Sequence, residues 1–226
     1  MKSRYLPVLL IILVFGLAWV FLLARVSTEQ MQGGKIMDKK TMAEEANKNM
    51  TPLQRDEALG NAKETAIFAA GCFWGVEEYF SRVKGVIKSE SGYTGGNKKN
   101  PSYEEVCTGK TGHAESVRVI FDPKVVSYEK LLQHFWEIHD PTSLNKQGND
   151  IGSQYRSAIF YTNPEQERMA KASLEKLAKS GRYSKKIVTE ILSAKEFYLA
   201  EEYHQDYLKK NPHGYCHIDL KKATME

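Results

Sequence analysis

The sequence is poor in cysteine. Only three cysteines, Cys72, Cys107 and Cys216, occur among 226 residues, and no two of them form a Cys-x-x-Cys pair. Zinc ribbons and thioredoxin-type redox motifs depend on such pairs, so neither is expected. Three thiols are also too few for a disulfide scaffold. The cysteine content therefore favours one reactive thiol, with or without a partner thiol.

Dense clusters of basic side chains are also missing. The 32 Lys and Arg residues stand against 28 Asp and Glu, for a net charge of +4. Such a mild excess gives no reason to expect a nucleic-acid partner. No internal repeat is visible, and no two histidines form a pair at helical spacing with an acid between them. We therefore expect neither nucleic acid nor a bound metal.

A long uncharged apolar run, Leu6 to Ala24, opens the chain. At about 1.5 Å per residue, a helix of this length nearly crosses a hydrocarbon core of about 30 Å. A cleaved signal peptide normally has an apolar core of roughly 7–15 residues followed by a small-x-small site. The sequence Leu23-Ala24-Arg25-Val26 offers no good site of that kind. Residues 1–25 are therefore predicted to be a retained signal-anchor transmembrane helix, with cleavage to a secreted or periplasmic protein as the alternative.

Basic residues at the extreme N-terminus set the expected orientation. Lys2 and Arg4 precede the apolar run, and the positive-inside rule keeps such a segment in the cytoplasm. Residues 26–63 are polar, contain no aromatic residue and are interrupted by Gly33-Gly34 and Pro52. This composition is typical of a flexible linker. The domain that follows, residues 64–226, is therefore predicted to be membrane-anchored and extracytoplasmic.

From Glu64 onward the sequence alternates between strand and helix patterns. Strands are predicted over 65–70, 115–121, 157–162 and 187–192, and helices over 72–83, 127–139 and 164–180. Ser127 is a plausible N-cap, and Pro164 suits a first helical turn. The elements do not follow strict βαβ spacing. They indicate an α/β fold of the α+β two-layer sandwich type, with a mixed sheet, flanking helices and a long irregular C-terminal tail.

A cysteine at a strand-to-helix turn is the first candidate for chemistry. It lies in the stretch Gly71-Cys72-Phe73-Trp74-Gly75. Unpaired N–H groups and the positive end of the helix dipole at such a turn favour a thiolate. Lone cysteines are, however, commonly small buried apolar residues. The flanking glycines and two aromatic neighbours favour a pocket, and from the residues alone both interpretations stay open.

Three further stretches combine polar, aromatic and glycine residues. Residues 101–115 contain glycines that predict a loop, and their carboxylates would ordinarily be solvated surface groups. Residues 148–157 would ordinarily form a turn into the following strand. Residues 211–218 hold Cys216 in a Pro/Gly-rich tail, where movement is easy.

Together these stretches resemble peptide methionine sulfoxide reductase A. GCFWG, PSYEEVCTGKTGHAE, NDIGSQYRS and GYCHI occur in the family's order across residues 64–220. The resemblance implies that Cys72 is the nucleophile, that Glu115 protonates the sulfoxide oxygen, and that Cys216 is a recycling cysteine. It also implies that Phe73 and Trp74 form the walls of a pocket for the S-methyl group. Three polar residues are then expected to hold the oxygen and order the site: Tyr103, Asp150 and Tyr155.

The same resemblance implies the wider reaction. The family reduces methionine-S-sulfoxide in proteins and peptides, without a cofactor, and a thioredoxin-like dithiol restores the enzyme. Some relatives carry a second recycling cysteine, but none follows Cys216 here. Cys107 matches no catalytic position and is expected to be a buried, inert thiol.

Sulfoxide chemistry explains why such a set of residues is needed. The sulfur is a poor electrophile until its oxygen is protonated, so the site needs a low-pKa thiol and a carboxylic acid still protonated near neutral pH. A helix N-terminus can supply the first. Burial among Phe73, Trp74, Tyr103 and Tyr155 would supply the second. Attack leaves a sulfenic acid on the cysteine, which a second thiol converts to a disulfide.

Two other classes of function remain possible on the residues alone. A cysteine hydrolase would need a Cys–His pair, with His113 and His139 as candidates that sequence cannot place. A membrane-tethered methionine- or peptide-binding module would use the aromatic residues as a cage and leave Cys72 unreactive.

Overall fold

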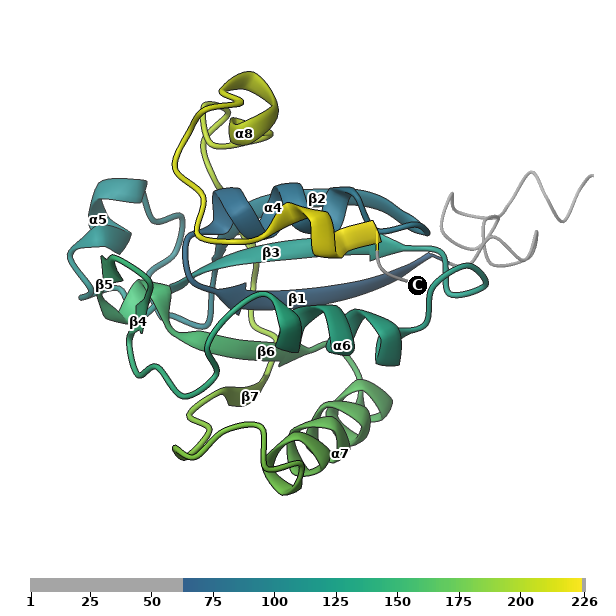
Figure 1. Ribbon diagram of the computed structural model, residues 1–226. Coiled ribbons are helices and arrows are strands. Elements are labelled where there is room, and N and C mark those ends of the chain that lie inside the picture. The colour runs from purple at the N-terminus through teal and green to yellow at the C-terminus, as the bar shows by residue number, and fades with distance from the viewer. Residues whose placement is uncertain (1–62, 225–226) are drawn as a thin grey trace, which may run out of the picture. The chain divides into compact units, whose positions relative to one another are not determined.

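A six-stranded mixed sheet lies at the centre of the computed structural model, which describes residues 63–224 (Figure 1). The strand order is β7-β6-β1-β3-β2-β8. Only the pairing of β6 with β7 is parallel among these strands. The strands are β1 (Glu64–Ala70), β2 (Val86–Thr94), β3 (Ala114–Phe121), β6 (Ser157–Tyr161), β7 (Glu190–Ser193) and β8 (Tyr198–Leu199).

Helices cover one face of this sheet. The three longest are α4 (Phe73–Ser81), α6 (Tyr128–Glu137) and α7 (Pro164–Lys179), and their apolar residues join one core cluster with the strands. Ser127 accepts a hydrogen bond from the Lys130 N–H and caps α6, as predicted. Pro164 occupies the first turn of α7, also as predicted.

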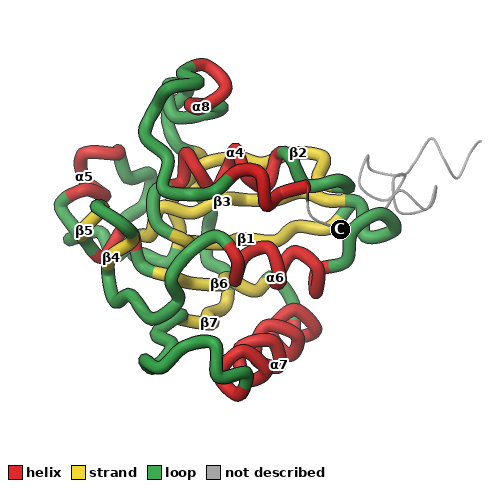
Figure 2. The backbone as a smooth tube through the Cα atoms, in the orientation of Figure 1, coloured by secondary structure: helices red, strands yellow, loops and turns green. Residues whose placement is uncertain are grey.

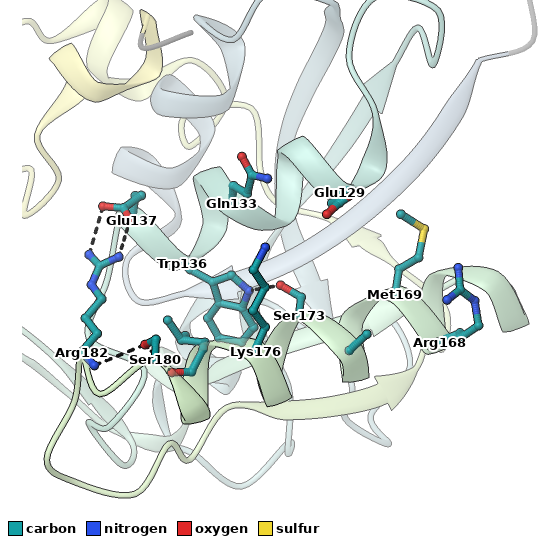
Figure 3. Close-up of a pocket in the computed structure, with 12 residues that line it drawn as sticks. Glu129, Gln133, Trp136, Glu137, Arg168, Met169, Ser173, Lys176, Ser180 and Arg182 are labelled. Atoms are coloured by element: carbon teal, nitrogen blue, oxygen red, sulfur yellow. Dashed lines mark hydrogen bonds and ion pairs between the residues drawn. The ribbon is translucent and has the colours of Figure 1, made fainter.

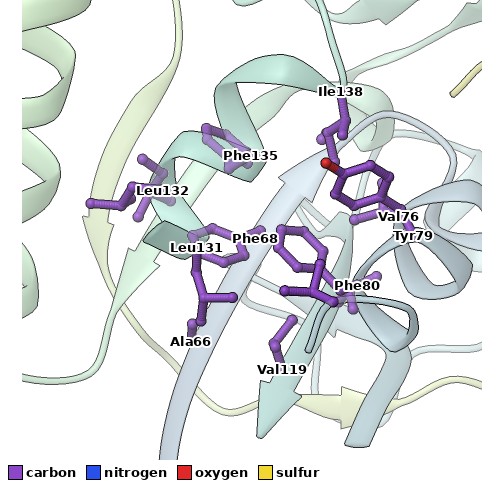
Figure 4. Packing of buried hydrophobic residues seen from close by; sticks show 14 of the residues in the cluster. Ala66, Phe68, Val76, Tyr79, Phe80, Val119, Leu131, Leu132, Phe135 and Ile138 are labelled. Carbon is purple, nitrogen blue, oxygen red and sulfur yellow. The ribbon is translucent and has the colours of Figure 1, made fainter. Parts of the chain in front are cut away.

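Aromatic stacking on the central strand builds the core between sheet and helices. The Phe68 ring on β1 lies 5.2 Å from Phe80 of α4 and 5.1 Å from Phe135 of α6, measured between ring centroids (Figure 4). Because side chains alternate along a strand, Ile67 points to the other face. There it packs in a smaller cluster beside Phe197. The strand that ends just before Cys72 is therefore held on both faces.

The C-terminal part of the chain is mainly irregular, as predicted. Beyond α7 the chain is mostly loop (Figure 2), with only two short strands, α8 (Tyr207–Lys210) and the 3₁₀ helix η2 (Leu220–Thr224) among the described residues. A small hairpin of β4 (Lys146–Gln147) and β5 (Asp150–Ile151) lies apart from the main sheet and is followed by the 3₁₀ helix η1 (Ser153–Tyr155).

Three local predictions are corrected by the structure. The stretch 101–115, expected to be a loop, contains α5 (Tyr103–Cys107). A capping box starts this helix, since Ser102 accepts from the Glu105 N–H while Glu105 accepts from the Ser102 N–H. Strand β2 was not predicted. It contains the charged residue Glu90, which pairs with Arg118 on β3, and sequence patterning does not reveal this contact. The strand predicted over 187–192 is β7, Glu190–Ser193.

The predicted anchor and linker, residues 1–25 and most of 26–63, lie outside the described residues. Within residues 63–224 no helix is both long enough and apolar enough to cross a membrane.

Candidate active site

Cys72 occupies the turn between the central strand β1 and helix α4. Its side chain is 7% exposed, and it holds the N-cap position without a side-chain capping bond. Gly71 before it has φ +92°, a conformation that glycine adopts at little cost. The predicted strand-to-helix turn is therefore present, with the thiol at the start of the helix.

Glu115 lies beside this turn on the neighbouring strand β3. It is 1% exposed, and its Oε2 accepts a hydrogen bond of 3.1 Å from the Phe73 N–H. Burial raises the pKa of Glu115 to about 8, with Asp150 acting in the same direction and the Phe73 N–H opposing it. The carboxyl group is therefore mainly protonated at neutral pH, as expected from its surroundings.

The thiol itself does not have the low pKa expected from its place at a helix N-terminus. Burial and the charge of Glu115 raise the pKa of Cys72, and the Trp74 N–H lowers it only in part. Desolvation thus outweighs the helix terminus. The low pKa expected for this thiol is therefore not found in this structure, and the proton on the thiol has to leave before attack.

Aromatic rings form the wall next to the thiol. The Phe73 ring lies 5.9 Å from Tyr93 and 5.0 Å from His204. Trp74 stacks on Tyr207 at 3.9 Å, and its indole N–H donates to His204 Nδ1 at 3.0 Å. Since His204 accepts at Nδ1, its proton is on Nε2. The indole of Trp74 is thereby fixed in position and orientation.

Two tyrosines and an aspartate bring polar groups to the same place. Burial, followed by the charge of Glu115, raises the pKa of both Tyr103 and Tyr155, which keeps the two phenols protonated as donors. Glu201 accepts from the Tyr103 N–H at 2.9 Å and so fixes the start of α5. Asp150 Oδ2 is buried and has no hydrogen-bond partner among the described residues.

The C-terminal tail passes over the first turn of α4. A Cβ atom built on Gly75 would lie 3.0 Å from Cys216 Sγ and 3.2 Å from Ile218 Cδ1. One built on Gly71 would lie 3.1 Å from His217 Cε1. Both glycines of GCFWG therefore make room for the tail. Cys216 is half-buried and packs against the core, so the tail lies docked at the site in this structure.

Cys107 is the one predicted residue whose environment differs outright. It was expected to be buried, yet it is exposed at the end of α5. A five-residue helix at the edge of the domain places its last residue in solvent. Partial desolvation of its sulfur still raises the pKa of Cys107, and the nearby Tyr103 hydroxyl lowers it only in part.

Neither histidine that a hydrolase would need contacts Cys72. His139 interacts with the Phe135 carbonyl at 2.8 Å and with Ser157 Oγ at 2.7 Å. His113 accepts from the Gly96 N–H and contacts the Lys98 carbonyl at 2.7 Å. Both imidazoles are thus occupied by structural partners. Within residues 63–224 no cluster of three or more His, Cys, Asp and Glu side chains could hold a metal ion.

A cavity elsewhere in the domain contains none of the predicted site residues. It lies between α6 and α7, has a volume of about 530 Å³, and has Trp136 and Met169 among its lining residues (Figure 3). The Trp136 indole donates to Ser173, and Arg182 pairs with Glu137 at one end of the groove (Figure 3). None of its lining residues is a cysteine.

The structure brings all eight predicted site residues to the end of β1, and it adds others that the sequence did not reveal. His204, Tyr207 and Glu201 come from a stretch dense in aromatic and acidic residues, 197–207, which was a signal that could have been used. Gln147 and His217 pack against Gly71, and no local pattern marks them.

A buried thiol beside a buried carboxylic acid, with a second thiol packed against Gly75 of the same helix, defines a thiol-dependent oxidoreductase on a mixed α/β fold. Comparison with known proteins gives the particular family. The family model for peptide methionine sulfoxide reductase matches residues 64–226.

Relatives and solved structures agree with this. The chain is 53% identical over 184 residues to peptide methionine sulfoxide reductase MsrA of Methanosarcina mazei, covering 80% of this chain and 86% of that one. It is 60% identical over 153 residues to MsrA of Geobacter metallireducens, covering 68% and 94%. The structure is similar to methionine sulfoxide reductase A of Corynebacterium diphtheriae, with a TM-score of 0.62, 43% identity and coverage of 68% and 77%. It is also similar to the reduced form of Mxr1 from Saccharomyces cerevisiae, with a TM-score of 0.63, 39% identity and coverage of 68% and 88%.

The chain belongs to the peptide methionine sulfoxide reductase A family. It is an oxidoreductase, and the reaction of its family is the reduction of methionine sulfoxide.

Proposed function

We propose that the protein reduces methionine-S-sulfoxide in oxidised proteins and peptides, with Cys72 attacking the sulfoxide sulfur and Glu115 supplying the proton to its oxygen. The observation that supports this most directly is the position of the Glu115 carboxyl group. It is buried, it accepts from the N–H of Phe73, and Phe73 directly follows Cys72. The acid on β3 is thus hydrogen-bonded to the backbone of the turn that carries the nucleophile.

The remaining residues supply substrate contacts. Phe73 and Trp74 offer an apolar wall for the S-methyl group, and the fixed indole of Trp74 limits which epimer fits. The protonated hydroxyls of Tyr103 and Tyr155 can donate to the sulfoxide oxygen. The partnerless oxygen of Asp150 is available to accept from a substrate N–H or from a tyrosine.

The first step forms a bond from Cys72 sulfur to the sulfoxide sulfur. The protonated oxygen then passes to the Cys72 sulfur while the new sulfur–sulfur bond and the original sulfur–oxygen bond break, which gives methionine and a sulfenic acid, so the thiol is oxidised and the sulfoxide reduced. One proton shared by Cys72 and Glu115 is enough for this step. Neither a metal nor a cofactor is required by it.

Recycling then requires Cys216. Its thiol attacks the sulfenic acid, water leaves, and a Cys72–Cys216 disulfide forms. The docked position of Cys216 Sγ beside Gly75, one helical turn from Cys72, supports this pairing. A thioredoxin-like dithiol would reduce the disulfide by thiol exchange.

The cellular location that we propose is based on the N-terminal sequence. Residues 1–25 would anchor the chain, residues 26–63 would act as a tether, and the catalytic domain of residues 64–226 would lie outside the cytoplasm. Cleavage after the apolar run would instead release the same domain. A reductant on the outer side of the membrane would then be needed.

The proposal is tested by turnover of methyl p-tolyl sulfoxide with a small dithiol. We expect consumption of the S epimer and none of the R epimer. Iodoacetamide should label Cys72 and block turnover. Turnover of both epimers, or full activity after complete labelling of Cys72, would contradict the assignment.

A further inference from the structure

The tail that carries Cys216 is attached to the site by three neighbouring side chains. A Cβ on Gly148 of the small hairpin would lie 3.5 Å from Tyr215 Oη. Ile218 is buried in the core beside Gly75. Between these two contacts, the imidazole of His217 lies against Gly71, and its Nε2 is 3.2 Å from the Ala70 carbonyl oxygen. Cys216 is therefore positioned by residues on both of its sides.

The His217 contact is a specific one. A carbonyl oxygen only accepts, so the proton of the ring is on Nε2. The other ring nitrogen, Nδ1, is buried and has no partner among the described residues. Burial lowers the pKa of His217, so the ring stays neutral. Ala70 ends β1 two residues before Cys72, which makes this hydrogen bond a polar link between the tail and the turn that holds the nucleophile.

We propose that His217 is the positioning residue for recycling: its Nε2–H bond to the Ala70 carbonyl holds Cys216 Sγ over Gly75, within reach of the Cys72 sulfenic acid. The inference rests on the proposed roles of Cys72 and Cys216. The step that it controls is Cys72–SOH plus HS–Cys216 giving the disulfide and water. The His217 hydrogen bond goes to the backbone of Ala70 and to none of the groups proposed to act on the sulfoxide, so methionine release should not depend on it.

Substitutions can separate the hydrogen bond from the shape of the ring. His217→Leu fills similar space without a donor, whereas the amide N–H of His217→Gln reaches about as far as imidazole Nε2. His213, four residues earlier in the same tail, is exposed. His213→Leu is therefore the matched control for a loss of imidazole that breaks no contact with the site.

The experiment follows one turnover of the fully reduced full-length protein, with N-acetylmethionine-S-sulfoxide and no reductant. Methionine product is counted, sulfenic acid is trapped with dimedone, and the Cys72–Cys216 disulfide is measured by mass mapping after rapid quenching. In His217→Leu we expect unchanged methionine release and disulfide formation slower by roughly 2- to 13-fold, the range for losing one neutral hydrogen bond. Dimedone adduct at Cys72 should rise correspondingly. His217→Gln and His213→Leu should match the unmodified protein.

Other outcomes overturn the inference. These are disulfide formation at the unmodified rate in His217→Leu, equal slowing in His217→Gln, or slowing of methionine release together with the disulfide. If His217→Leu does not fold, His217→Asn takes its place with the same expectation, because its shorter amide cannot reach Ala70. Absence of methionine release from the unmodified protein would instead refute the proposed function itself.

Discussion

The proton shared by Cys72 and Glu115 gives a prediction that the structure makes quantitative. The pKa of Glu115 is raised to about 8 and that of Cys72 is raised above its ordinary value. At pH 7 roughly nine-tenths of the molecules therefore hold both protons. A neutral thiol is a poor nucleophile. The reactive form is the one that has lost a single proton, so that Cys72 can be a thiolate while Glu115 keeps its acid proton.

The fraction of molecules that have lost one proton sets the pH dependence of the rate, because the form with a Cys72 thiolate and a protonated Glu115 is a constant share of them. With a pKa of about 8 for Glu115, that fraction is roughly 0.1 at pH 7 and roughly 0.9 at pH 9. We therefore expect kcat/KM, which reports ionisation of the free enzyme, to rise about tenfold between these pH values. Stopped-flow single turnovers with methyl p-tolyl sulfoxide measure it cleanly, because this substrate has no ionisable group.

Glu115→Gln removes the acid and keeps an oxygen that can accept from the Phe73 N–H. We expect the inflection near pH 8 to disappear and the rate at the plateau to fall by roughly 10²–10⁴-fold, the usual contribution of general acid catalysis. Glu104→Gln, on the exposed side of α5, is the matched control and should behave as the unmodified protein. A rate that falls between pH 7 and 9 would show that the doubly protonated pair reacts. A loss under threefold in Glu115→Gln would mean that another group protonates the oxygen.

The remaining predictions concern the thiols and the location. Cys72→Ser should abolish sulfoxide reduction without lowering the melting temperature, and single-turnover activity comparable to the unmodified protein would sink the mechanism. Cys216→Ser should release one methionine per enzyme and then stall when a thioredoxin-like protein is the only reductant, with partial rescue by small thiols; steady turnover would contradict its role. Cys107→Ser should leave the rate within twofold, because the exposed thiol at the end of α5 is not part of the proposed disulfide, and a Cys72–Cys107 disulfide in mass maps would refute this. An alkaline phosphatase fusion after Lys63 should be active if the domain is exported, whereas an inactive fusion together with a fluorescent cytoplasmic green fluorescent protein fusion would show that the topology is wrong.

The motifs predicted the candidate reactive residues because the proposed chemistry needs particular residue types close together in the chain. A tight strand-to-helix turn with a pocket beside it is indicated by Gly71, Cys72 and the aromatic pair that follows. The caps at Ser127 and before Pro164 also depend only on neighbouring residues, and both are present. Short α5 could have been predicted too, since Ser102 and Glu105 have the spacing of a capping box.

Protonation could not be derived in the same way. A helix N-terminus lowers a thiol pKa, but the burial of Cys72 and the nearness of Glu115 act in the opposite direction and prevail. Both effects depend on how β1, β3 and α4 pack together, and residues 43 positions apart in the chain meet only in that packing. Exposure of Cys107 was likewise a matter of where α5 lies on the domain.

By itself, the sequence determined the family and a mixed α/β fold with an irregular tail, and it predicted the nucleophile, the acid and the recycling cysteine. Each of these can be recognised from contiguous residues or from a pattern repeated along one element. Tertiary structure alone decided that the tail lies docked over Gly71 and Gly75, that His204 orients Trp74, and that Glu201 fixes the start of α5. These contacts join segments separated by about a hundred residues or more, so their existence depends on the path of the chain across the sheet and leaves no periodic or local signal in the residues themselves.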